Sequence, residues 1–206
     1  MYAKTTFVSP YRTVEPPMPA TNDEIATEFR SQVLRYGYRR AAVEDVARAL
    51  RISKKTIYEA FASKEELYRY AVKLWANEQR RHVESMLTEA SALGRIAQVT
   101  SIAFADARRG FADNPFHDSS EPPEIVAEVN AQVFGPMIRD LLEQGNASGE
   151  FGVADPATTA AFVVAIGTEA VRMLREDPSS HPEDAALDAL RRLVIGKVHE
   201  EGPGDE

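Results

Sequence analysis

The sequence contains no cysteine, and this absence removes several classes of chemistry at once. Disulfide bonds, thiolate metal sites and cysteine nucleophiles are all excluded. A chain of 206 residues, 44% of them hydrophobic, has enough apolar material to fold around its own core without such cross-links. A cysteine-free chain suits a reducing compartment, so we predict a cytoplasmic protein that needs no cofactor.

Long hydrophobic runs are scarce as well. The longest, residues 160–166 with the adjoining Gly167, is far shorter than the roughly 20 residues needed to cross a bilayer, and no membrane contact is predicted. The first 21 residues contain four prolines and lack the apolar centre of a secretory signal. We expect a flexible N-terminal tail over residues 1–21 and a disordered tail over residues 200–206.

Charge is divided unevenly along the chain, whose net charge is −8. Residues 22–75 contain 11 Lys and Arg against 8 Asp and Glu, whereas residues 76–206 contain 11 against 23. A small basic module on an acidic body is what a DNA-binding protein with a separate regulatory domain shows, because only the surface that meets DNA needs positive charge.

Apolar residues recur at intervals of three and four almost throughout, whereas the alternation typical of strands is scarce. The predicted fold class is therefore all-α. Helices are expected over residues 22–36, 43–50, 54–61 and 64–90, the last one started by a capping box of Ser63 and Glu66. Further helices are expected from beyond Gly94 to about 111, over 124–146 with an interruption near Gly135-Pro136, over 156–176, and from 182 to about 199.

Two of these helices are short and are joined by only three residues. Ser53 stands at the N-cap of the second, where its side chain can accept a backbone N–H. That helix opens with Lys54-Lys55-Thr56, so its positive dipole end and its side chains can reach phosphates or base edges. The layout is typical of a helix-turn-helix that binds DNA.

These motifs predict two domains. An N-terminal three-helix helix-turn-helix domain spans residues 22–66, and a larger helical domain spans residues 67–199.

The segment GYRRAAVEDVARALRISKKTIYEAFASKEELYRYAV resembles the DNA-binding segment of the TetR family of bacterial repressors. The resemblance rests on Gly37-Tyr38, Ile52-Ser53, Ile57-Tyr58, Phe61 and Ser63-Lys64-Glu65, which have the family's spacing. It covers about residues 25–75. The rest of the chain agrees only in length, helicity and a Gly-Glu-Phe…Asp-Pro loop at residues 149–156.

The resemblance implies roles for individual residues. It places Ser53, Lys54, Lys55 and Thr56 at the major groove, lets the Tyr58 hydroxyl and Lys64 contact phosphates, and makes Ile57 and Phe61 core residues. Arg39 or Arg40 is a further candidate for a phosphate contact, because Ala41-Ala42 occupy the position where family members usually have Thr. Glu59 either accepts from a cytosine or pairs with Lys55, and we favour the pairing.

Without the family, the same residues have simpler interpretations. The lysines could form a solvated helix face, and Tyr58 could be a core residue with its hydroxyl at the rim. The capped two-helix frame favours the DNA-binding interpretation for the lysines, whereas the phosphate role of Tyr58 depends on the resemblance.

Effector binding is also implied by the resemblance, in a cavity between the long fourth helix and those that follow. The candidates are Trp75, Gln79, His82, Met86, Phe104, Arg108, Phe111, Phe116, His117, Phe134, Met137 and Ile138. Each could instead be an ordinary core residue. The polar candidates Gln79, His82 and Arg108 need partners if buried, and a ligand would provide them. The four histidines form no pair with metal-ligand spacing, so no metal site is expected.

The stretch 157–174 is apolar nearly all round, and such a helix needs cover on both sides. With the last helix it could form half of a four-helix dimer interface. The predicted interface residues are Phe162, Ile166, Met173, Leu187, Leu190 and Val194. The alternative is that both helices merely complete the core of one protomer.

The sequence as a whole predicts a non-enzymatic, dimeric repressor that binds a palindromic operator in double-stranded DNA. A small apolar or amphipathic effector would release it. Two alternatives stay open: a helical scaffold or enzyme whose basic N-terminus binds a protein or an acidic substrate, and a DNA-binding regulator without a ligand.

Overall fold

The computed structural model describes residues 20–113 and 122–195, except the side chains of residues 110–113. These residues form eight helices and no strand, so the all-α prediction is confirmed. The helices are α1 (Asn22–Tyr36), α2 (Val43–Leu50), α3 (Lys54–Ala60), α4 (Lys64–Met86), α5 (Ala92–Asp113), α6 (Pro123–Ser148), α7 (Pro156–Glu176) and α8 (Pro182–Ile195). The tails predicted at residues 1–21 and 200–206 lie outside the described residues, apart from residues 20 and 21.

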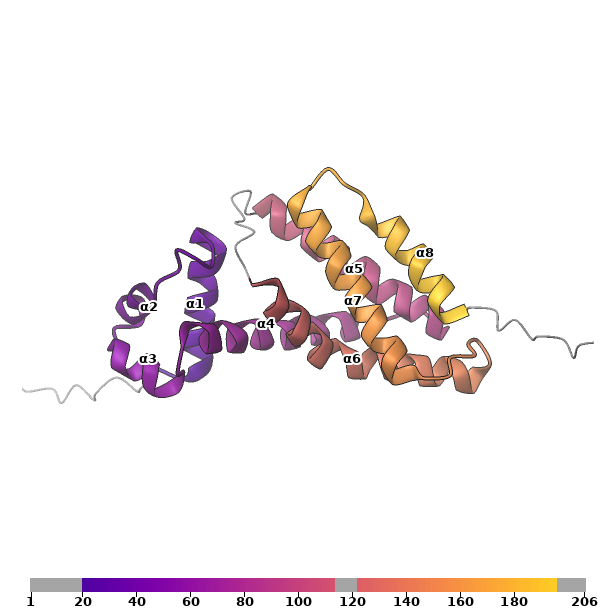
Figure 1. The fold of residues 1–206 in the computed structure, drawn as a ribbon, viewed down its shortest axis with the longest axis horizontal. Coiled ribbons are helices and arrows are strands. Elements are labelled where there is room, and N and C mark those ends of the chain that lie inside the picture. The colour runs from indigo at the N-terminus through magenta and orange to yellow at the C-terminus, as the bar shows by residue number, and fades with distance from the viewer. Residues whose placement is uncertain (1–19, 114–121, 196–206) are drawn as a thin grey trace, which may run out of the picture.

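Helices α1 to α3 lie together at one end of the molecule, and α5, α7 and α8 lie at the other (Figure 1). Helix α4 runs from the first group to the second, and α6 crosses beside it. We call α1 to α3 with the first half of α4 the N-terminal unit, and the remainder the body. Because α4 is part of both regions, a tilt of this helix displaces parts of both.

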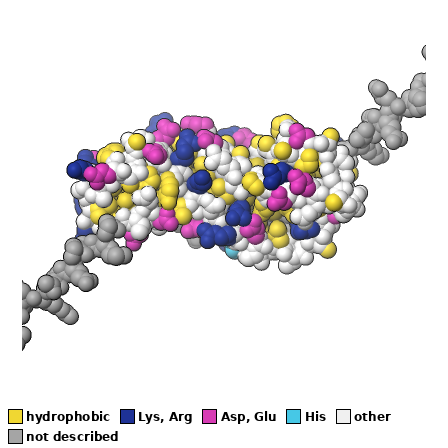
Figure 2. Space-filling view, turned by 90° about the horizontal axis from the view of Figure 1, so that it is seen from below, with side chains coloured by type: hydrophobic (Ala, Val, Ile, Leu, Met, Phe, Trp, Pro, Cys, Tyr) yellow, Lys and Arg dark blue, Asp and Glu magenta, His cyan; other side chains and the backbone are white. Residues whose placement is uncertain are grey.

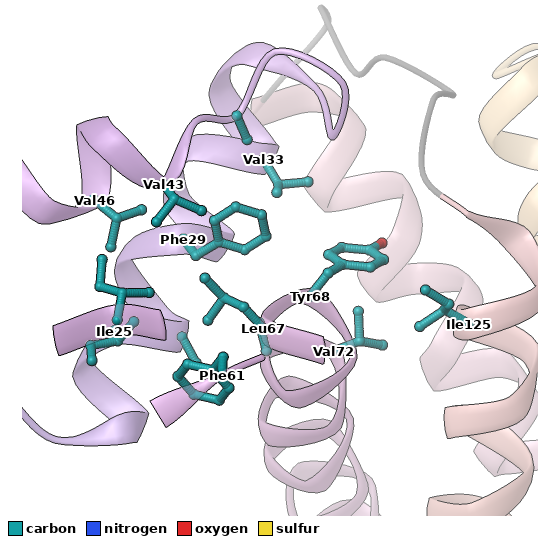
Figure 3. Packing of buried hydrophobic residues seen from close by; sticks show 14 of the residues in the cluster. Ile25, Phe29, Val33, Val43, Val46, Phe61, Leu67, Tyr68, Val72 and Ile125 are labelled. Carbon is teal, nitrogen blue, oxygen red and sulfur yellow. The ribbon is translucent and has the colours of Figure 1, made fainter. Parts of the chain in front are cut away.

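The core of the N-terminal unit is built from the apolar faces of its four helices. Ile25 and Phe29 of α1 and Leu67 of α4 lie together there (Figure 3), and like Ile57 of α3 they are at most 1% exposed. Ile125 at the start of α6 packs in the same cluster, beyond Tyr68 and Val72 in Figure 3. The N-terminal unit is therefore attached to the body through α6 as well as through α4.

The body has its own apolar clusters. The larger includes Ile96 of α5, Leu142 of α6 and Val194 of α8, all at most 2% exposed. A smaller cluster joins Phe104 of α5 to Leu174 of α7. Phe134 of α6 packs against both the N-terminal core and the larger body cluster.

The start of α4 differs in one detail from the capping box expected there. The Ser63 side chain does accept from the backbone N–H of Glu66 at 3.0 Å. The Glu66 carboxylate, however, accepts from the N–H of Ala62 at 2.7 Å, not from Ser63. A complete capping box instead starts α1, where Thr21 and Glu24 exchange both bonds.

Other helices also differ from the prediction, and α5 begins at Ala92 and not beyond Gly94. Helix α6 runs without interruption through Pro136, although proline has no N–H to donate in a helix. Packing of α6 against α4 and α7 along its length holds the helix together there. Helix α4 ends at Met86 and not near residue 90, because Gln98 of α5 accepts the N–H groups of Thr88 and Glu89.

Candidate nucleic-acid interface, effector cleft and apolar face

The second helix of the helix-turn-helix, α3, begins as the sequence predicts. Ser53 is its N-cap and accepts from the Thr56 N–H at 3.0 Å. The two hydroxyls also lie 2.9 Å apart and share a hydrogen bond. These contacts fix the first turn of α3, so the side chains that follow Ser53 leave the protein in defined directions.

The two adjacent lysines of α3 have different partners. Lys54 donates to the Glu44 carboxylate of α2 at 2.6 Å, and this hydrogen bond lowers the pKa of Glu44 and raises the pKa of Lys54. Lys55 lies 3.6 Å from Glu59 one turn later, which confirms the expected pairing, and its side chain is 84% exposed. Lys55 is therefore the more available cation of the two.

The remaining residues of α3 divide between core and surface. Ile57 and Phe61 are 1% and 3% exposed, as expected for the core residues of this helix. Tyr58 is 49% exposed, so it lies at the surface of α3 and not in that core.

Lys64 has a structural contact that the sequence did not suggest. Its ammonium donates to the Tyr38 carbonyl at 2.6 Å and to the Arg39 carbonyl at 3.3 Å, and it lies 4.7 Å from the centre of the Tyr38 ring. Partial burial lowers its pKa. Lys64 thus ties the α1–α2 connection to α4, and one of its three N–H donors is left for a phosphate.

Two arginines flank these helices. Arg40 is exposed just before α2, as a phosphate contact requires. Arg51 is exposed in the turn between α2 and α3 and adopts a left-handed conformation, with φ of 56° and ψ of 37°. The sequence interpretation missed Arg51, because a left-handed turn position usually signals itself by glycine. Figure 2 shows Lys and Arg side chains beside Asp and Glu side chains over the face seen from below.

The N-terminal unit matches a known family. The model for bacterial regulatory proteins of the tetR family matches residues 31–71, which run from the middle of α1 through the helix-turn-helix into α4. Over these residues the chain is similar to the DNA-binding segment of TetR-family regulators. No curated protein matches the chain.

Solved structures share the fold over most of the chain at low identity. RolR in complex with resorcinol has a TM-score of 0.68 and 15% identity, covering 90% of this chain and 95% of that one. FadR from Bacillus halodurans, a fatty acid degradation regulator, has a TM-score of 0.61 and 18% identity, covering 87% and 97%. FadR from Bacillus subtilis in complex with stearoyl-CoA has a TM-score of 0.57 and 18% identity, covering 84% and 98%.

The residues expected to bind an effector do not lie around one cavity. Phe104 is 3% exposed inside the small α5–α7 cluster, whereas Met86 is 43% exposed on the surface. Met137 packs on the larger body cluster together with Ile138. His82 is exposed and lies 3.9 Å from Asp106. Phe116, His117 and the Phe111 side chain lie outside the described residues.

Arg108 already has the partners that a ligand was expected to supply. It donates to the Glu183 carboxylate at 2.6 Å and to the carbonyls of Pro178 and Ser180, and it lies 3.2 Å from a ring nitrogen of His181. The residue fastens α5 to the α7–α8 connection. Its polar character therefore has a structural explanation.

Trp75 lines a different cleft, which we call the interdomain cleft. It is small, with a volume of about 50 Å³. The lining comes from α1 (Arg30, Val33, Leu34), α4 (Tyr68, Ala71, Val72, Trp75), α6 (Val126) and α7 (Arg175). Of the expected effector residues, Trp75 is the one in this lining.

The six expected dimer residues separate by exposure. Phe162 and Met173 of α7 are 54% and 47% exposed, and Ile166 and Leu187 are half-buried. Leu190 and Val194 of α8 are only 3% and 2% exposed, because both pack in the core of their own protomer. The outward apolar face therefore belongs mainly to α7.

Helix α7 is also long and apolar enough to resemble a membrane-spanning helix. By length and composition alone it is the one helix among residues 20–113 and 122–195 that could cross a membrane. Only 22% of its most apolar 18-residue stretch is buried. The apolar surface of α7 is thus larger than the protomer itself covers.

Proposed function

We propose that the protein is a dimeric repressor that binds a palindromic operator and is released by a small-molecule effector. The observation that carries the proposal is the first turn of α3, which is fixed by the Ser53 cap and presents Lys55 on the surface. A helix N-terminus with an adjacent, largely exposed lysine suits DNA phosphates and base edges in the major groove. The contact would be completed by Lys54, Thr56, Tyr58, Lys64 and Arg40. We add Arg51, because it is exposed in the turn between α2 and α3.

Effector control is supported by the fold relatives and by the path of α4. RolR was solved with resorcinol and one FadR with stearoyl-CoA, so this fold accommodates small ligands. Helix α4 starts beside α3 and continues into the body (Figure 1). An effector held in the body would tilt α4 and change the separation of two DNA-binding units, which must lie about 34–36 Å apart to bind successive half-sites.

The DNA contact is tested by the salt dependence of binding to a palindromic duplex. Lys55→Ala should weaken binding and alter sequence preference, because the largely exposed Lys55 side chain would meet base edges beside Thr56. Lys64→Ala should weaken binding to every duplex and reduce the salt slope by about one unit. Fluorescence anisotropy at several salt concentrations measures both effects.

The matched control is Lys73→Ala, which removes one exposed cation from α4 outside the helix-turn-helix. Its affinity should equal that of the unchanged protein. Equal affinities for Lys55→Ala, Lys64→Ala and Lys73→Ala in folded proteins would reject the proposed DNA surface.

Dimerisation is supported by the uncovered apolar face of α7. Phe162 is more than half exposed, so Phe162→Asp costs little in an isolated protomer but places an unpaired charge in a dimer interface. Sedimentation at micromolar concentration should show a dimer of about twice 22.8 kDa for the unchanged protein and a monomer for Phe162→Asp. Ala131→Asp, which adds the same charge at an exposed position of α6, should stay dimeric. An unchanged protein that sediments as a monomer would contradict the proposal.

Effector control has a test that does not require the repressed genes. An effector that weakens operator binding by a given factor must itself bind more weakly to the operator complex by the same factor. Equal effector affinity with and without operator DNA would reject release by the effector, even if both ligands bind.

A further inference from the structure

A lysine and a glutamate join the two helices of the helix-turn-helix. The Lys54 ammonium of α3 donates to the Glu44 carboxylate of α2 at 2.6 Å. Lys54 is the first residue of α3, and the first turn of α3 is the part proposed to contact DNA bases. The Glu44 carboxylate therefore lies at the proposed DNA surface, although the sequence suggested no role for this residue.

The other acidic residues of α2 and α3 pair within their own helix. Asp45 lies 2.6 Å from Arg48 in α2, and Glu59 lies 3.6 Å from Lys55 in α3. Glu44 differs from both, because its cation belongs to the neighbouring helix, ten positions along the chain. The packing of α2 on α3 thus holds an anionic and a cationic group side by side.

Both members of the pair keep hydrogen-bonding capacity on their exposed sides. The side chains of Lys54 and Glu44 are 53% and 54% exposed. An ammonium has three N–H donors and an ionised carboxylate has about four acceptor sites, so one shared hydrogen bond leaves others available. That bond lowers the pKa of Glu44 and raises the pKa of Lys54, so both side chains stay charged at neutral pH. The pair presents a donor and an acceptor in a fixed order.

A G·C base pair has the complementary order in the major groove. Guanine offers two acceptors, N7 and O6, and cytosine offers its N4 donor. O6 and N4 are hydrogen-bonded to each other and lie about 2.9 Å apart, close to the 2.6 Å between the Lys54 and Glu44 atoms. An A·T pair is less complementary, because the adenine N7 acceptor beside N6 repels a carboxylate and the thymine methyl group lies beside O4.

We propose that Glu44 and Lys54 together recognise one G·C base pair in each half-site, with Lys54 on guanine and Glu44 on cytosine. The inference rests on the proposed function, because it assigns a base preference to that DNA surface. Glu44 contributes specificity and not general affinity. Its charge repels phosphates, so it weakens binding to DNA that offers no cytosine amino group at this position.

The test selects bound DNA from a pool of random duplexes, each about three helical turns or roughly 30 base pairs long. The full-length protein, Glu44→Gln and Lys54→Gln are each used for selection, and the bound duplexes are sequenced. We expect the unchanged protein to select G·C at one position of each half-site. Both variants should lose about 5–150-fold of preference at that position alone. A variant that only damaged the fold would lose preference at every position.

Asp45→Asn is the matched control, because it removes an acidic charge from the same turn of α2 but from a pair with Arg48. It should keep the G·C preference. A double variant, Glu44→Lys with Lys54→Glu, exchanges the two ends of the pair and keeps the net charge. It should select C·G in place of G·C at that position, because the order of donor and acceptor is reversed.

The proposal is overturned if the unchanged protein selects no G·C pair in its half-sites, or if Glu44→Gln keeps the full preference. It is equally overturned if Asp45→Asn loses that preference, or if the exchanged pair does not reverse it. These outcomes leave the proposed function standing, because the unchanged protein still selects a palindromic sequence. A pool from which the unchanged protein selects no sequence contradicts the proposed function itself, and this inference with it.

Discussion

The N-terminal unit and the body of this protein bury their apolar residues with different completeness. In the N-terminal unit, the apolar faces of α1, α2 and α3 meet α4 and the start of α6, and its large core side chains are almost fully covered. In the body, α7 leaves Phe162 and Met173 about half exposed. The core of the N-terminal unit is therefore covered by its own helices, whereas the body keeps an exposed apolar face on α7 that suits a protein partner.

The two regions should differ most clearly in stability when a large core side chain is replaced by alanine. Phe29→Ala removes a fully buried ring from the N-terminal core and should cost about 3–5 kcal/mol, while Leu174→Ala in the small body cluster should cost about 2–5 kcal/mol. Denaturation followed by Trp75 fluorescence and by circular dichroism compares the two. We expect Phe29→Ala to unfold the N-terminal unit first, because Phe29 lies in a cluster that meets the larger body cluster at Phe134 of α6.

Coincident fluorescence and circular dichroism transitions for Phe29→Ala would contradict that separation. They would mean that Phe134 and the shared helices α4 and α6 join both regions into one cooperative unit.

A close approach inside the body gives a smaller effect of defined sign. A Cβ atom on Gly145 of α6 would lie 2.0 Å from the Phe151 ring, so Gly145→Ala should destabilise the protein by about 1–3 kcal/mol. Gly135→Ala in the same helix meets nothing within 4 Å and should stabilise by about 0.5–1 kcal/mol. Opposite shifts of the thermal midpoint are the expected result, and equal shifts would refute the packing argument.

The smallest expected effect concerns the start of α5 in the body, which is capped by Glu150 from far along the chain. Glu150 accepts from the backbone N–H groups of Ala92 and Leu93, each at 3.1 Å, and thereby caps α5 from a distant loop. These bonds lower the pKa of Glu150 from its ordinary value of 4.5. Its stabilising effect is therefore fully present above pH 4.5 and is lost as the pH falls through the lowered pKa.

Glu150→Gln should consequently melt below the unchanged protein at pH 7, with a difference that shrinks below about pH 4.5. Glu78→Gln, at an exposed position of α4, serves as the control and should melt like the unchanged protein at both pH values. A gap for Glu150→Gln that stays constant with pH would show that the carboxylate charge is not what caps α5.

The N-terminal unit was predictable because its signals are local. The expected helices 22–36 and 43–50 coincide with α1 and α2, and the third ends one residue earlier than expected. Gly37, Ser53 and the alternation of Ile57 with exposed neighbours fix these boundaries within a few residues of sequence. The domain boundary at residue 66 stays a prediction, since Leu67 and Ile125 share one core cluster.

In the body the sequence predicted helices better than it predicted contacts. Leu190 and Val194 have the spacing of an interface, but both are buried in their own protomer. The sequence suggested a ligand contact for Arg108, but in the structure Arg108 donates to Glu183, 75 residues later in the chain. Spacing along a helix tells which residues share a face, but not what covers that face.

The sequence by itself determined the all-α class, the helix-turn-helix with its Ser53 cap and its resemblance to the TetR family. These depend on neighbours within one or two helical turns, where residue identity sets the geometry directly. Only the tertiary structure decided that Lys64 holds the α1–α2 connection, that Arg30, Trp75 and Arg175 line one cleft, and that α7 keeps an apolar face outside. Those outcomes join residues that lie 25 or more positions apart, and such distant contacts follow from the packing of whole helices.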